Sequence, residues 1–73
     1  MKYTVIIEQG RESGYVVYCP ALKGCVSQGG TKEEALRNIK EAIEVYIEAL
    51  LDDGLSVPTE VGKDIVELEI AAK

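Results

Sequence analysis

The sequence predicts a two-layer α+β fold with the element order β-β-β-α-β. Three short segments that alternate apolar and polar residues precede one long amphipathic stretch, and a fourth alternating segment follows it. Short connections favour an antiparallel meander for the first three strands, whereas the long crossover favours a fourth strand parallel to the first and beside it. One face of this sheet would lack a helix. We expect a single domain over residues 1–73, because no linker or repeat divides the chain.

The three meander strands have clear ends. In the first strand Tyr3, Val5 and Ile7 point one way, and the polar loop 9–14 with its two glycines suits a hairpin turn. Pro20 cannot donate a ladder hydrogen bond and ends the second strand, and two consecutive glycines end the third. The strands are expected over residues 1–8, 15–19 and 25–28.

One long helix is predicted over residues 32–53, between a capping box and a closing glycine. The Thr31 side chain can accept from the Glu34 N–H, while Glu34 can reach back to the Thr31 N–H. Gly54 suits the left-handed residue that ends a helix. At about 100° per residue, one face gathers the apolar residues Ala35, Leu36, Ile39, Ala42, Ile43, Tyr46, Ile47 and Leu50.

The apolar stripe widens in the C-terminal half of this helix, where Val45, Ala49 and Leu51 add to it. A single small sheet cannot cover that perimeter, so these residues are predicted to form an interface in a homo-oligomer, a dimer or a tetramer. The alternative is that Val45 and Leu51 are merely exposed, since single apolar residues are common on protein surfaces.

The last strand is expected over residues 64–70, after a linking loop that Pro58 stiffens. Val66, Leu68 and Ile70 should face the core, while the glutamates between them face water.

Composition restricts the classes of function. The formal net charge is −5 and the pI is near 4.6, and the basic residues are scattered, so direct nucleic-acid binding is not expected. An acidic surface suits a basic protein partner, or solubility alone. Cys19 and Cys25 fit neither a disulfide scaffold nor a common zinc spacing, and they are interpreted as buried thiols in a reducing cytoplasm. No secretory signal or membrane span is expected.

Enzymatic chemistry finds little support in the sequence. The chain has no histidine, which removes the usual general base, and no phosphate-binding loop. The carboxylate pairs Glu67 with Glu69 and Glu44 with Glu48 have the spacing of solvated surfaces. We therefore expect no catalytic residue, cofactor or metal, and a metal-dependent nuclease is the weakest hypothesis.

Eight residues of the stretch 18–35 form one motif: Pro20, Leu22, Gly24, Cys25, Gly30, Thr31, Glu34 and Ala35. They look architectural, since they suit a strand stop, tight backbone and a helix cap. With this motif the sequence resembles the HicB family of antitoxins, and the similarity extends over nearly the whole chain. The resemblance implies a non-catalytic, partial ribonuclease-H-like fold, frequent oligomerisation, and neutralisation of HicA, a small basic RNA-cleaving toxin.

Toxin contact is expected on the acidic helix face and the first hairpin, with solvated charges as the alternative. Full-length HicB proteins often add a C-terminal DNA-binding module; this chain stops after the last strand, so operator binding is not expected. The alternative function is an oligomeric domain of the same fold that binds another protein or a small ligand. The expected toxin-binding residues are Arg11, Glu12, Glu41, Glu44 and Glu48.

Overall fold

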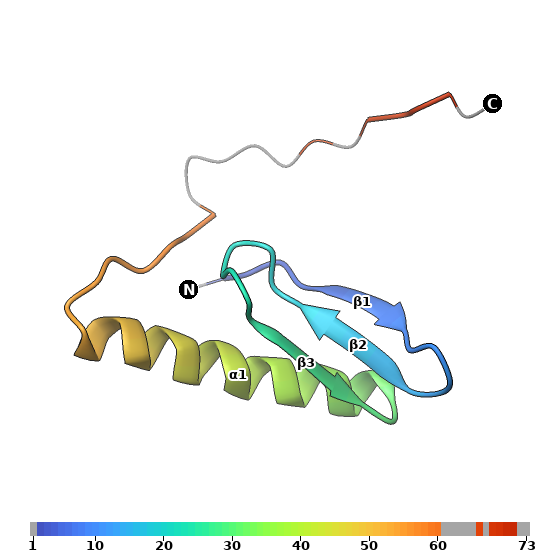
Figure 1. Cartoon of the computed structure of the whole chain (residues 1–73), viewed down its shortest axis with the longest axis horizontal. Coiled ribbons are helices and arrows are strands. Elements are labelled where there is room, and N and C mark those ends of the chain that lie inside the picture. Colours follow the sequence, from blue (N-terminus) through green and yellow to red (C-terminus); the bar gives the residue numbers. More distant parts are fainter. Residues whose placement is uncertain (1, 61–65, 67, 72–73) are drawn as a thin grey trace.

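A three-stranded sheet and one long helix make up the body of the molecule (Figure 1). The structure is a computed structural model and describes residues 2–60, 66 and 68–71. The elements follow the predicted order β-β-β-α and are β1 (Ile6–Gln9), β2 (Tyr15–Tyr18), β3 (Val26–Gly29) and α1 (Lys32–Asp52).

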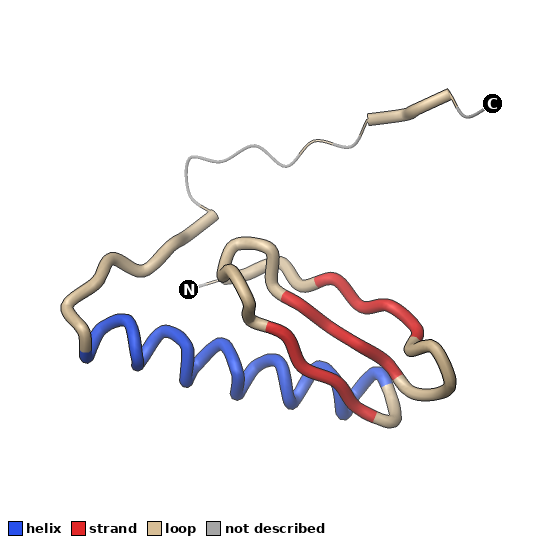
Figure 2. Tube along the Cα trace, in the orientation of Figure 1, coloured by secondary structure: helices blue, strands red, loops and turns tan. Residues whose placement is uncertain are grey.

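The sheet is the predicted antiparallel meander, with the strand order β1-β2-β3 (Figure 2). In the described part of the chain, β1 and β3 therefore both have a free edge. The register places Ile6 opposite Tyr18 and Tyr18 opposite Val26, which gives an apolar row across the sheet. Ile6 and Val26 are exposed on this row, as expected for the face that lacks a helix.

The core lies between the sheet and α1. Val17 and Leu22 are fully buried, and the face of the first segment that carries Tyr3, Val5 and Ile7 packs against the core. The buried core residues are Val17, Cys19, Leu22, Cys25, Ala35 and Ile39.

The helix is much longer than the sheet that it covers. At about 1.5 Å per residue, the 21 residues of α1 span about 32 Å, whereas a strand of four residues spans about 13 Å. The C-terminal half of α1 consequently projects beyond the strands (Figure 2). Leu51, in the last turn of α1, is 62% exposed.

The strands differ at their ends from the prediction. The sequence predicts a strand from residue 1, but β1 begins only at Ile6, after residues 2–5. The reason lies on the neighbouring strand: Pro20 has no N–H, and the Cys19 N–H donates to the Cys25 carbonyl (3.1 Å). Residues before Ile6 therefore have no ladder partner on β2. β2 ends at Tyr18 rather than at Cys19, and β3 is shifted by one residue to Val26–Gly29.

The helix start corrects one detail of the predicted capping box. The Glu34 N–H donates to the Thr31 hydroxyl (3.1 Å) as predicted, but the Glu34 carboxylate accepts from the Gly30 N–H (2.7 Å) rather than from Thr31. The turn before the helix brings the Gly30 N–H within reach of this carboxylate. At the other end Asp53 is the C-cap, so the helix is one residue shorter than predicted, and Gly54 has the expected positive φ of 70°.

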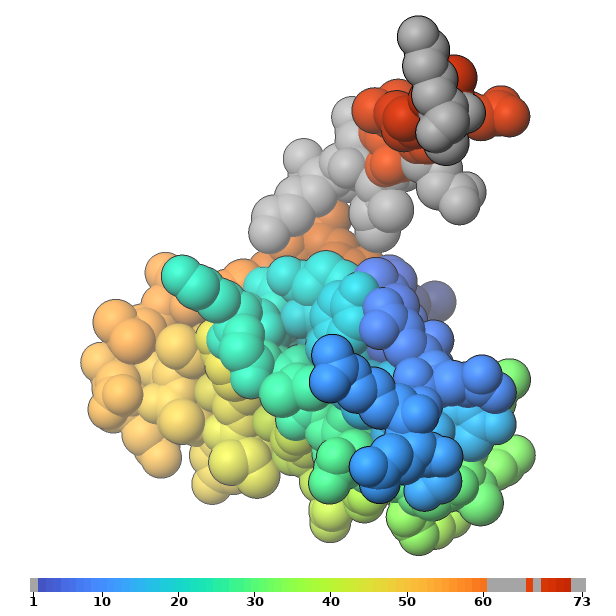
Figure 3. Space-filling model, turned by 45° about the vertical axis from the view of Figure 1, so that its right-hand side comes forward, coloured from blue at the N-terminus to red at the C-terminus, as the bar shows by residue number. Residues whose placement is uncertain are grey.

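The predicted fourth strand falls largely outside the described residues. Of the range 64–70, the structure describes residues 66 and 68–70, and none of these is in a strand. Val66, Leu68 and Ile70 are 70%, 76% and 76% exposed, so their predicted inward orientation is not confirmed. Figure 3 shows the described part of this segment, drawn in red, apart from the sheet and the helix.

The chain after α1 returns to the N-terminal segment. The Tyr3 hydroxyl donates to the Pro58 carbonyl, and the Thr4 N–H and hydroxyl both donate to the Glu60 carboxylate. These hydrogen bonds hold the loop after α1 beside Tyr3 and Thr4, which precede β1.

Candidate functional site

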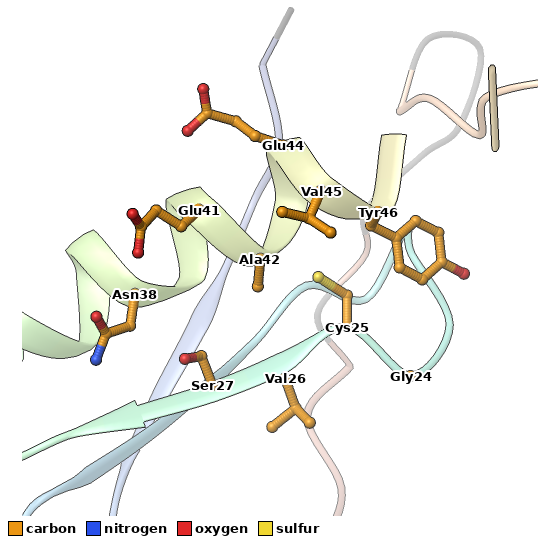
Figure 4. Close-up of a pocket in the computed structure, with 10 residues that line it drawn as sticks. All are labelled: Gly24, Cys25, Val26, Ser27, Asn38, Glu41, Ala42, Glu44, Val45 and Tyr46. Carbon is orange, nitrogen blue, oxygen red and sulfur yellow. The ribbon is translucent and has the colours of Figure 1, made fainter. Parts of the chain in front are cut away.

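A groove of about 840 Å³ lies between β3 and α1 (Figure 4). Because β3 is an edge strand, the groove opens at the side of the molecule. The turn before β3 and the strand itself contribute Gly24, Cys25, Val26 and Ser27, and α1 contributes Asn38, Glu41, Ala42, Glu44, Val45 and Tyr46.

Two side-chain hydrogen bonds hold the helix against this side of the sheet. The Asn38 amide donates to the Gln28 carbonyl (2.7 Å), and the Tyr46 hydroxyl donates to the Lys23 carbonyl (2.8 Å). The two bonds lie about two helical turns apart. They fix the distance between the walls of the groove.

The turn between β2 and β3 forms one end of the groove and contains half of the predicted family motif. Its backbone closes on itself, because the Leu22 N–H donates to Cys19 (3.1 Å) and the Cys25 N–H donates to Leu22 (3.0 Å). Leu22 is fully buried, and Gly24 has a φ of 80°, which favours glycine. Pro20 is exposed at this turn. All four motif residues of this half therefore lie in the turn or directly before β3.

The rest of the motif forms the start of α1, where the structure adds a residue that the sequence did not single out. A Cβ on Gly29 would lie 2.5 Å from the Ala35 nitrogen, whereas a Cβ on Gly30 would meet only the flexible Glu34 carboxylate at 3.7 Å. The close approach that requires glycine is therefore at Gly29, and Gly30 serves as the N–H donor to Glu34. Ala35 is fully buried under this turn.

The groove combines exposed apolar atoms with negative charge. Val45 is 65% exposed. In Figure 4 Cys25 and Ala42 point into the space between strand and helix, while Glu44 extends away from it and Val26 points away from α1. From Glu41 onward every charged residue of α1 is acidic, and its last turn contains no basic residue. Negative charge at a helix C-terminus opposes the helix dipole.

The structure distributes the predicted toxin-binding residues over two adjoining grooves. Glu41 and Glu44 line the groove of Figure 4, whereas Arg11 and Glu12 line a second groove, of about 760 Å³, beside the β1–β2 turn. Ser27 and Asn38 line both grooves. Glu48 is exposed and lines neither of them.

The predicted oligomer-interface residues are all exposed, but they do not lie together in the groove. Val45 lines it beside Glu41 and Glu44, whereas Ala49 and Leu51 lie beyond it toward the end of α1. The sequence did not single out Asn38, Tyr46 or Val26 as site residues. For Tyr46 a signal existed, since a tyrosine in an apolar stripe needs a partner for its hydroxyl.

The two cysteines are free and buried, as predicted. Burial, and then the neighbouring Cys19, raise the pKa of the Cys25 thiol above its ordinary value of 9.0. A raised pKa keeps a thiol protonated and therefore weakly nucleophilic at neutral pH. Among residues 2–60, 66 and 68–71, no three His, Cys, Asp or Glu side chains form a cluster that could hold a metal ion. Within the same residues, no helix is both long and apolar enough to span a membrane.

Comparison with known proteins identifies the family. Residues 3–70 match the family described as "HicB_like antitoxin of bacterial toxin-antitoxin system". A UPF0150 protein from Synechocystis is 55% identical over 58 residues, which cover 80% of this chain and 73% of that protein. Antitoxin HicB 1 from Photorhabdus laumondii is 35% identical over 77 residues, which cover all of this chain and half of that protein.

A solved structure agrees with this relationship. A chain of the "HicA3 and HicB3 toxin-antitoxin complex" has 34% sequence identity and a TM-score of 0.66, over 81% of this chain and 67% of that chain. The motif at the β2–β3 turn and at the start of α1 occupies the structural positions that its residue types predict. The chain belongs to the HicB-like antitoxin family of bacterial toxin–antitoxin systems.

Proposed function

We propose that this chain is an antitoxin that binds and neutralises a small basic RNA-cleaving toxin of the HicA type, and that the toxin docks on the groove between β3 and α1. The observation that carries the proposal is the composition of this groove. Exposed Val45 lies beside Glu41 and Glu44 on α1, and no basic residue follows further along the helix. A basic partner would compensate this charge and cover the apolar atoms.

The neighbouring free edge of β3 supports the same assignment. An edge strand presents backbone donors and acceptors that a strand of a partner can pair with. The groove opens along this edge, so one partner could contact both surfaces. The likeness to a chain of a toxin–antitoxin complex supports a HicA-type partner.

Neutralisation by occlusion does not require this chain to catalyse a reaction. The acidic rim would occupy the basic surface with which the toxin binds RNA, and the apolar atoms would exclude water from the contact. We therefore infer a binding protein rather than an enzyme. We place it in the cytoplasm, where Cys19 and Cys25 would remain reduced.

The test measures binding to a HicA-type toxin encoded beside this gene. We expect the Glu41→Lys/Glu44→Lys variant to raise the dissociation constant at least about tenfold, because two attractive contacts become repulsive. Inhibition of RNA cleavage should be lost in parallel. Titration calorimetry and an RNA-cleavage assay measure the two effects.

The matched control is Asp52→Lys/Asp53→Lys, which changes the net charge equally at the C-terminal end of the same helix, outside the groove. Equal effects of both variants would contradict the docking site and indicate a general charge effect. If the unmodified chain fails to bind the toxin, the alternative of an oligomeric domain with another partner is favoured.

We further infer that the chain forms homo-oligomers, with Val45, Ala49 and Leu51 as the contact surface on α1. The support is the exposure of Val45 and Leu51, at 65% and 62%. Since Val45 also lines the groove, toxin binding and self-association would compete there.

A further inference from the structure

The hydrogen-bond pattern of the sheet determines which backbone groups of β3 face its free edge. Along an antiparallel strand, the backbone groups of successive residues alternate in direction. The Cys19 N–H donates to the Cys25 carbonyl (3.1 Å), so the carbonyl of Cys25 is directed toward β2. Val26 and Gln28 therefore direct their N–H and carbonyl groups outward, to the edge that no strand covers in the described part of the chain.

Side chains of α1 occupy backbone acceptors on either side of Val26. The Asn38 amide donates to the Gln28 carbonyl (2.7 Å), and the Tyr46 hydroxyl donates to the Lys23 carbonyl (2.8 Å). Within residues 2–60, 66 and 68–71, no side chain forms a hydrogen bond with the N–H or the carbonyl of Val26. Val26 is thus the open position of this edge, between two carbonyls that the chain satisfies itself.

The two faces of the sheet differ in chemistry at this open position. Val26 is 56% exposed and points away from α1 (Figure 4), in the apolar row of Tyr18 and Ile6. On the other face lies the groove that Glu41 and Glu44 line. The side chains of a strand alternate between the faces of a sheet. A strand added at this edge would therefore meet apolar atoms with one side and negative charge with the other.

We infer that the toxin contributes a β-strand that pairs with Val26 at the edge of β3, with an apolar side chain opposite Val26 and basic side chains directly before and after it. The N–H and the carbonyl of Val26 would form one hydrogen-bonded residue pair with this strand. The basic side chains would extend over the groove toward Glu41 and Glu44. Because Asn38 occupies the Gln28 carbonyl, the pairing would be confined to the Val26 end of β3. This inference rests on the proposed function and specifies how the toxin binds.

A proline at position 26 tests the strand pairing. Val26→Pro removes an N–H that faces outward, so the hydrogen bonds between β2 and β3 remain, as is usual for proline on an edge strand. We expect the dissociation constant for the toxin to rise at least about tenfold, with the circular dichroism of the free chain unchanged. Val26→Thr keeps the shape and the N–H and is the matched control. It should bind the toxin nearly as the unmodified chain does.

Amide hydrogen exchange in the unmodified chain provides a second measurement, which decides the question even if Val26→Pro does not fold. Toxin binding should slow exchange of the Val26 N–H at least about tenfold. By the same alternation, Ile7 and Gln9 direct their N–H groups to the outer edge of β1, away from β3. Their exchange should not change when the toxin binds, so they serve as internal controls.

The outcomes separate this inference from the proposed function. If neither Val26→Pro nor toxin binding has the expected effect, while Glu41→Lys/Glu44→Lys weakens binding, the strand pairing is wrong and the proposed function stands. Slow exchange of Val26 in the chain without toxin, increasing with its concentration, would assign this edge to a second copy and also overturn the inference. If the unmodified chain binds no toxin, the proposed function and the strand pairing are both wrong.

Discussion

Two adjacent glycines before α1 differ in what the structure demands of them. A Cβ on Gly29 would lie 2.5 Å from the Ala35 nitrogen and 2.9 Å from the Glu34 carbonyl carbon, both of which are backbone atoms. A Cβ on Gly30 has ordinary space, and Gly30 is not among the glycines with positive φ.

We therefore expect Gly29→Ala to lower the free energy of unfolding by about 1–3 kcal/mol, the usual range for overpacking. Gly30→Ala, as the matched control, should change it by less than about 0.5 kcal/mol. Urea denaturation followed by circular dichroism measures both. If the two variants are equally stable, the turn must be able to move away from the helix.

The Cys25 thiol makes stability depend on alkaline pH. Burial, and secondarily Cys19, raise its pKa above 9.0, so the folded chain holds the proton to higher pH than the unfolded chain does. The contribution of the protonated Cys25 thiol to the stability of the folded chain is fully present below the ordinary thiol pKa. It is lost as the pH rises through the raised pKa of the folded chain. We expect the free energy of unfolding to fall from about pH 9 upward.

The Cys25→Ala variant separates this effect from that of Tyr3, whose pKa is also raised, first by burial and then by Cys19 and Glu60. The variant should show a shallower loss of stability on the alkaline side, measured by urea denaturation under reducing conditions across this pH range. An identical slope in the variant would assign the pH dependence to Tyr3 or another group.

At the scale of elements, the helix is the part of the fold that its own sequence specifies most completely. The Thr31 cap, the apolar stripe and Gly54 are local signals, and the structure reproduces them to within one residue. The β-meander follows in the same way from alternation and turn residues. The need for glycine at position 29 arises from packing against α1 and has no local signal.

The exposed apolar residues of α1 give a prediction for self-association of the chain. Val45→Glu should weaken self-association about tenfold, because it puts a charge on an exposed apolar side chain of the proposed contact. Arg37→Glu, on the polar side of the helix, should have the smaller effect although it changes the net charge by more. Sedimentation equilibrium without toxin measures the difference, and a larger effect of Arg37→Glu would point to charge repulsion instead.

At the scale of the whole molecule, the fold class follows from the sequence, but the position of the last segment does not. A strand needs a partner, and the alternation at Val66, Leu68 and Ile70 specifies one apolar face without specifying which chain covers it. For the same reason the sequence identifies Glu41 and Glu44 as acidic residues of one helix face, while the groove that joins them to Cys25 depends on how α1 crosses β3.

The helix is attached unequally on its two sides. On the β3 side Asn38 and Tyr46 bind backbone carbonyls, whereas no side-chain hydrogen bond between α1 and β1 occurs among the described residues. We therefore expect the β3 side of α1 to be held more firmly than its β1 side. An antitoxin of this construction would keep the shape of its proposed docking groove even where the opposite side of the helix adapts.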